Sequence, residues 1–155
     1  MTTMLLALVL SLPIAAADQH QHPSSPDRAN QGMGFDQDKT THHFLLQAAG
    51  GVIEVTAKDA TDAASVDQIR VHLRHIASAF ANGDFSLPMF IHDTDPPGVA
   101  TMKERRTQIT FRYEDVTAGG KVFVVTADSV ARAALHDFLR YQIREHKTGD
   151  PLTPR

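Results

Sequence analysis

Nine histidines and no cysteine set the chemistry that this 155-residue sequence can offer. His72 and His75 are three residues apart in a segment with helical spacing, so both imidazoles can point to one side of a helix. Neutral imidazole binds copper, zinc and nickel, and two ligands on one rigid helix lower the entropy cost of assembling a site. The alternative is that His72 is an aromatic residue at the edge of the core, since it aligns with Phe138 in an internal repeat.

Other candidate ligands lie outside this helix. His42 and His43 are neighbours in an expected strand, where successive side chains point to opposite faces, so only one of them can join any single site. If Phe44 points into the core, His42 shares its side of the strand. His92 and Met89 lie between the two repeats and could add an imidazole and a thioether. Each of these residues could instead be an ordinary core or surface side chain.

The amino-terminal segment has the pattern of a secretory signal peptide. Residues 4–14 form a nearly unbroken apolar run, and three alanines at 15–17 precede a polar stretch. We therefore expect a signal peptide over residues 1–17 and a periplasmic or secreted protein, with an uncleaved anchor as the alternative because the segment lacks Lys and Arg. Cleavage after Ala17 would expose Asp18-Gln19-His20, which resembles the amino-terminal motif that binds Cu(II) or Ni(II) in a square plane.

The mixture of sulfur and nitrogen donors bears on which metal would bind. Thioether together with imidazole suits copper better than zinc, magnesium or calcium, and Met33 and Met102 are further thioethers. The sequence thus predicts a transition-metal site, with copper as the preferred ion and zinc or nickel as alternatives. The candidate ligands are His20, His42, His43, His72, His75, Met89 and His92.

Two similar halves indicate a duplicated ββα unit. Ala49-Gly50-Gly51 corresponds to Ala118-Gly119-Gly120, and each turn joins two β-rich runs that precede a segment with helical periodicity, 66–80 and 131–142. This pattern predicts an α+β fold with a four-stranded, largely antiparallel sheet and two helices on one face. Residues 85–106 match neither unit and form either a functional insertion or a cover for the sheet.

Composition sets the domain organisation and excludes several classes of protein. With 42% hydrophobic and 21% charged residues and a net charge of −3, the chain has no basic surface suited to nucleic acid and, after cleavage, no segment for stable membrane insertion. We expect a flexible arm over 18–40, a single α+β domain over 41–150 and a disordered tail over 151–155. Standard catalytic motifs are missing, so we expect binding rather than catalysis.

Several segments resemble a known group of proteins. They are Met33-Gly34-Phe35, Thr41-His42-His43-Phe44, His72-Leu73-Arg74-His75-Ile76, Pro96-Pro97-Gly98 and Phe138-Leu139-Arg140. Over residues 33–150 the chain resembles short secreted bacterial proteins without an established activity, some of which carry the label aspartate carbamoyltransferase. We do not expect that activity, because this chain lacks the Ser-Thr-Arg-Thr-Arg phosphate loop and is too short for two α/β domains.

The sequence favours one function and leaves others open. The favoured function is that of an extracytoplasmic protein that binds a transition metal, with copper as the preferred ion, for sequestration or delivery. The alternative is a metal-free binding module or homodimer that recognises a small ligand or a partner protein. A small hydrolase or lyase with a histidine base, or a haem held by one histidine, are further alternatives.

Overall fold

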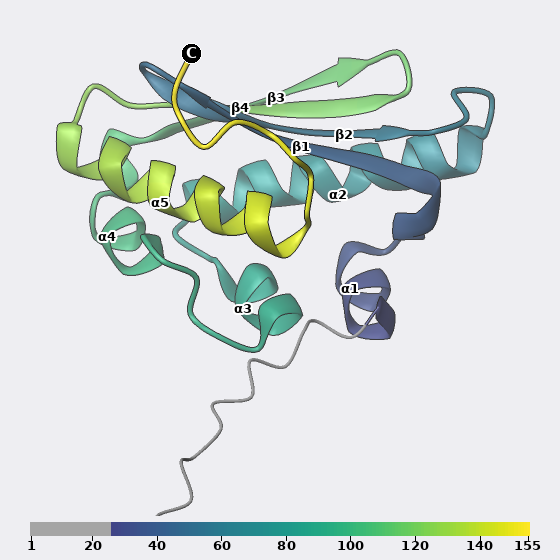
Figure 1. Cartoon of the computed structure of the whole chain (residues 1–155), viewed down its shortest axis with the longest axis horizontal. Helices are drawn as coiled ribbons and strands as arrows, with labels where there is room; N and C mark the ends of the chain where they lie inside the picture. Colours follow the sequence, from purple (N-terminus) through teal and green to yellow (C-terminus); the bar gives the residue numbers. More distant parts are fainter. Residues whose placement is uncertain (1–25) are drawn as a thin grey trace, which may run out of the picture.

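The computed structural model describes residues 26–155, so the expected signal peptide and His20 lie outside the described residues. Five α-helices, two 3₁₀ helices and four strands make up this part of the chain (Figure 1). In chain order they are α1 (Pro26–Met33), η1 (Gln37–Lys39), β1 (Thr40–Gln47), β2 (Gly50–Ala57), α2 (Ala63–Ala81), α3 (Ser86–His92), α4 (Val99–Glu104), η2 (Arg106–Gln108), β3 (Thr110–Val116), β4 (Gly119–Val125) and α5 (Ser129–Glu145).

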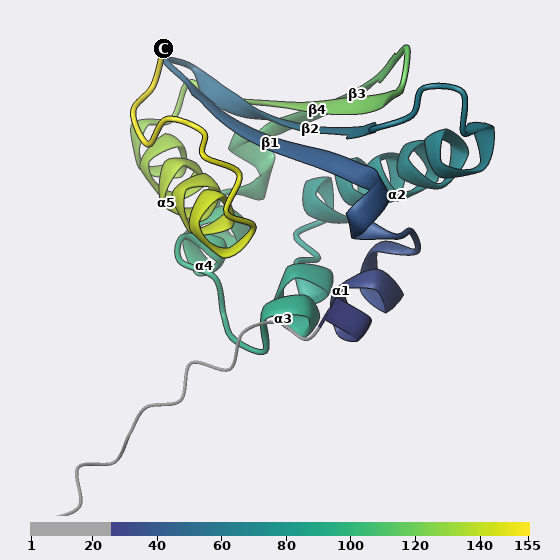
Figure 2. The same ribbon diagram turned by 45° about the vertical axis from the view of Figure 1, so that its right-hand side comes forward.

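The strands form one antiparallel sheet in the order β1-β2-β4-β3, which confirms the predicted α+β fold. Each hairpin belongs to one ββα unit, and β2 pairs with β4 at the centre. The helices all lie on one side of the sheet, with α2 and α5 nearest to it and α3 and α4 beneath them (Figure 1). Figure 2 shows that α2 and α5 diverge beneath the sheet.

Both long helices begin at an aspartate that caps the amino terminus. The side chain of Asp62 accepts a hydrogen bond from the backbone N–H of Ser65 at 3.2 Å, and Asp128 accepts one from Ala131 at 2.7 Å. A side-chain oxygen at this position satisfies a backbone donor that has no partner within the helix. The apolar stripe of each helix then faces the inner surface of the sheet, so the predicted periodicity is confirmed.

Three phenylalanines join the two units to the segment between them. The rings of Phe80 and Phe85 stack with centroids 4.4 Å apart, and Phe138 meets them edge-on at 5.9 and 6.2 Å. All three are buried. Edge-to-face contacts of this kind add stability beyond the burial of apolar area. This cluster fixes where α3 leaves the end of α2.

Residues 26–40 are not the flexible arm that the polar composition suggested. They contain α1 and η1, and Met33 and Phe35 are only 6% and 4% exposed. Gly34 ends α1 with a φ of 73°, and its N–H donates to the carbonyl of Asn30 at 2.9 Å. The burial of these two large apolar side chains stabilises the packing of the segment against the core.

Residues 151–155 also differ from the expected disordered tail. The backbone N–H of Arg155 donates to the carbonyl of Leu46 in β1 at 3.2 Å, and Arg140 in α5 donates through Nε to the carbonyl of Leu152 at 2.9 Å. The segment therefore runs beside the edge strand, where carbonyl groups lack a neighbouring strand. None of the helices between residues 26 and 155 combines the length and hydropathy needed to cross a membrane.

Candidate functional site

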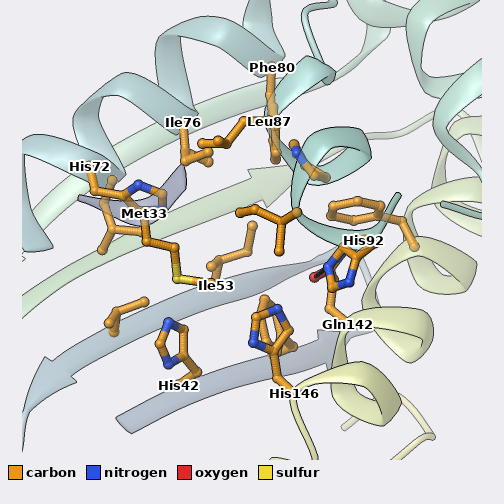
Figure 3. A pocket seen from close by; sticks show the side chains of 16 residues that line it. Met33, His42, Ile53, His72, Ile76, Phe80, Leu87, His92, Gln142 and His146 are labelled. Atoms are coloured by element: carbon orange, nitrogen blue, oxygen red, sulfur yellow. Dashed lines mark hydrogen bonds between the residues drawn. The ribbon is translucent and has the colours of Figure 1, made fainter. Parts of the chain in front are cut away.

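A pocket lies under the sheet, where α2 and α5 diverge (Figure 3). Its floor is the inner face of β1 and β2, its sides are α2 and α5, and α3 closes it from below, with Met33 at one end. The walls are apolar apart from four histidines and Gln142. The cavity volume is about 50 Å³. A cavity needs roughly 10–15 Å³ for one water, so this one fits a few atoms or a single ion with a small ligand.

The four histidines form a row across the pocket, which we call the histidine row: His72, His42, His146 and His92. They come from α2, β1, the residue that caps α5 and the last turn of α3. The ring centroids of His42 and His146 are 5.4 Å apart, and those of His146 and His92 are also 5.4 Å apart. Figure 3 shows the four rings facing the same space from three sides.

The alternation of β1 explains which neighbouring histidine enters the pocket. His42 shares the inner face with Phe44, whereas His43 points to the opposite face, as the sequence predicted for an inward Phe44. His43 instead meets the carboxylate of Asp150 at 2.9 Å. The same carboxylate accepts a hydrogen bond from the backbone N–H of Phe44 at 2.9 Å. Asp150 therefore fixes the segment after His146 against the strand that carries His42.

Burial keeps the imidazoles of the histidine row neutral at pH 7. Desolvation lowers the pKa of His42 and of His72 to about 4, helped by the charges of neighbouring histidines. For His146, burial and then the charges of His42 and His92 lower the pKa to about 3. A low pKa means that each ring stays neutral, with a proton on one nitrogen and an available lone pair on the other, which is the form that binds metals.

Gln142 orients the ring of His92. Its Oε1 lies 3.1 Å from Nε2 of His92, and because an amide oxygen only accepts, Nε2 carries the proton and Nδ1 carries the lone pair. Nδ1 has no hydrogen-bond partner and lies 4.0 Å from a carboxylate oxygen of Glu145. Burial lowers the pKa of His92 despite the opposing effects of Gln142 and Glu145. Metal-binding histidines are commonly held by such a bond to the far nitrogen.

Three buried side-chain atoms among the described residues have no hydrogen-bond partner, and all three belong to residues that line this pocket. They are Nε2 of His42, Nδ1 of His92 and Nε2 of Gln142. Native proteins pair almost all buried polar atoms, because each unpaired one costs about 1–3 kcal/mol. Their concentration in one cavity makes this pocket the candidate binding site.

The structure brings together three of the seven candidate ligands. His42, His72 and His92 line the pocket. His75 is exposed on α2, and the sulfur of Met89 lies 3.8 Å from the ammonium of Lys103, so neither belongs to the pocket lining. His43 lies on the other face of the strand, and His20 is outside the described residues.

Sequence analysis did not single out His146 or Gln142. Because they are four residues apart on α5, they share one face of the helix, and this spacing was the available signal. Met33 was considered only as a sulfur donor on an arm, whereas its side chain reaches into the pocket (Figure 3).

The spacing of the rings is close to that of a metal site, although the nitrogens do not converge. With metal–nitrogen bonds of about 2.1 Å, two imidazoles on one tetrahedral ion have centroids about 5 Å apart. The observed separations are 5.4 Å. Within residues 26–155, however, no three side chains of His, Asp or Glu already stand in a metal-binding arrangement. The rings would have to turn toward a common point.

A second, polar cavity of about 420 Å³ adjoins the first and shares His42 and His146 with it. We call it the vestibule. Its walls include Lys58, which follows β2, Glu145 at the end of α5, and Lys147 beyond it. His42 and His146 thus belong to the walls of both the polar cavity and the apolar pocket.

Comparison with known proteins adds no family to this description. A scan of the chain against models of protein families, a search of curated proteins and a search of solved structures each found no match. The function has to be argued from the pocket.

Proposed function

We propose that this chain binds a single transition-metal ion, Cu(I) in preference, in the pocket under the sheet. His42, His146 and His92 would be the ligands, with the thioether of Met33 as a further donor. The observation that carries the proposal is that two ring nitrogens of the histidine row are buried without any partner in a cavity of ion size. The role would be sequestration or delivery of copper outside the cytoplasm, where the apolar residues 4–14 would direct the chain.

The charge of the pocket favours a monovalent ion. No carboxylate is among the residues that line it, and its histidines are neutral, so the carboxylate of Glu145, 4.0 Å from Nδ1 of His92, could balance a single positive charge. The cost of moving an ion into a medium of low dielectric constant grows with the square of its charge, so a divalent ion costs about four times as much as a monovalent one. Neutral nitrogen and sulfur ligands also match the soft Cu(I) ion better than Zn(II) or Ni(II).

One observation favours a second candidate, a metal-free module that binds a small ligand. The potential ligands among residues 26–155 are not converged, and the pocket is otherwise apolar. A few-atom molecule that donates a hydrogen bond to His42 or His92 would satisfy the same atoms.

The test is Cu(I) binding by the mature chain, measured anaerobically against a coloured Cu(I) chelator and confirmed by elemental analysis. His146→Phe should weaken Cu(I) binding at least tenfold, because it removes a ligand while keeping an aromatic ring against His42 and Phe44. His75→Phe is the matched control, since His75 is exposed on α2.

The amino-terminal motif needs its own control. His20→Ala removes the third-position imidazole, so copper retained by this variant is bound elsewhere. If the parent chain binds neither Cu(I) nor Zn(II), or if His146→Phe binds as tightly as His75→Phe, the metal proposal fails and the second candidate takes its place.

A further inference from the structure

The third unpaired atom in the pocket is a donor, and a metal ion cannot satisfy it. Nε2 of Gln142 carries two hydrogens, is buried with its residue 4% exposed, and has no partner. A bare ion would take the lone pairs of His42 and His92 but would leave this amide unpaired. A hydrogen-bond acceptor is therefore missing from the pocket as well as an ion.

The position of the amide is fixed by its other half. Oε1 of Gln142 accepts from His92, 3.1 Å away, and the oxygen and nitrogen of an amide point in different directions from the same carbon. While Oε1 holds His92, Nε2 cannot take that place, and it stays without a partner in a residue that lines the pocket. One residue thus both orients a proposed metal ligand and presents a free N–H group beside it.

We propose that the ion in this pocket keeps one open coordination position for a small exogenous ligand, and that Gln142 Nε2–H donates a hydrogen bond to that ligand. This inference rests on the proposed copper site. The cavity of about 50 Å³ leaves space beside an ion for about two or three atoms. The ligand class is therefore a diatomic or triatomic molecule with a lone pair at its outer end, not an organic substrate.

Carbon monoxide is a suitable probe, because it binds Cu(I) with an open position and its stretching frequency responds to a hydrogen bond at its oxygen. The Cu(I)-loaded parent chain should bind carbon monoxide with a stretching band that Gln142→Leu moves to higher wavenumber. The affinity for carbon monoxide should fall about fivefold in the variant, the factor that corresponds to one lost hydrogen bond.

Two variants separate the donor from the support of His92. Gln142→Glu keeps an oxygen that can accept from His92 Nε2–H but has no amide N–H, so at a pH where this carboxyl is ionised it should move the band in the same direction as Gln142→Leu. Gln68→Leu is the matched control, because Gln68 is exposed on α2 and should leave the band unchanged.

The outcomes distinguish this inference from the proposed function. If the chain loads Cu(I) but binds no carbon monoxide, or if the band is the same in the parent and in both Gln142 variants, the open position and the donor role are wrong while the copper site stands. If the chain does not load copper, both proposals fail.

Discussion

The histidine row should make the fold unstable in mild acid. In the unfolded chain each histidine has a pKa near 6.5. In the folded chain the pKa values of His42 and His72 are about 4 and that of His146 is about 3. Between these limits the unfolded chain binds more protons, so the free energy of unfolding falls as the pH falls. The stability is fully present above pH 6.5 and is lost progressively toward pH 4.

The size of the effect follows from the same values. Between pH 7 and pH 5 each of the three histidines lowers the free energy of unfolding by about 2 kcal/mol, or about 6 kcal/mol together. His92 acts in the same direction, because burial lowers its pKa too. A domain of this kind has only about 5–15 kcal/mol in total, so the metal-free protein should be close to unfolding at pH 5.

The assay is urea unfolding of the metal-free chain at pH 7, 6 and 5, followed by far-ultraviolet circular dichroism with a chelator present. His146→Phe removes one titrating group and keeps the aromatic contacts with His42 and His92, so the loss between pH 7 and pH 5 should shrink by about 2 kcal/mol. His75→Phe should leave most of the loss in place, because burial is the largest cause of the lowered pKa of His72 and the charge of His75 the smallest. Two results would refute the burial of neutral histidines. One is a free energy of unfolding that does not change between pH 7 and pH 5, and the other is a decrease in this free energy that is as large in His146→Phe as in the parent chain.

Three substitutions test the contacts that hold the helices and strands around the pocket in place. Phe138→Ala should lower the free energy of unfolding by about 3–5 kcal/mol in urea titrations, because Phe138 is 2% exposed at the centre of the aromatic cluster. Gly98→Ala should cost at least about 1 kcal/mol, since φ is 85° and a Cβ would lie 2.0 Å from the carbonyl oxygen of Ala134. Gly34→Ala is its control, with φ of 73° but nothing within 4 Å, and should cost less in thermal unfolding. Asp150→Asn should cost about 1–3 kcal/mol by weakening the bonds to β1, and should weaken Cu(I) binding through His146.

The repeated ββα pattern was predictable because each unit carries its own local signals. The β-rich runs marked the strands, and helical periodicity marked α2 and α5. The glycine pairs that were expected to form the turns are instead the first residues of β2 and β4, directly after the turns at 48–49 and 117–118. The helix α3 carried no such signal. It has seven residues, includes Pro88, and lacks a side-chain cap, so it depends on contacts with the rest of the fold that a single sequence does not display.

The site was predictable only in part, for a related reason. Side chains alternate between the two faces of a strand, so His42 enters the pocket and His43 does not once the buried face is known. In the same way, the helical repeat of α2 places His72 in the pocket lining and His75 at the surface. The meeting of His42 with His146 depends on packing between residues that are 104 positions apart. No local sequence pattern shows that residues so far apart in the chain are in contact. The pocket itself lies between α2 and α5, whose divergence is likewise a property of the tertiary packing.

The duplication places a histidine and a phenylalanine at equivalent positions of α2 and α5, and both residues line the pocket. His72 aligns with Phe138 of the second unit, and Phe138 packs against Phe80 and Phe85. In the first unit the corresponding side chain is a smaller, polar imidazole, met edge-on by Phe35 at 5.3 Å. If both positions served only stability, an apolar ring would pack better at either, because a buried polar group without a full set of partners costs free energy. The imidazole of His72 lines the same cavity as the unpaired nitrogens of His42 and His92, which supports the proposed binding site.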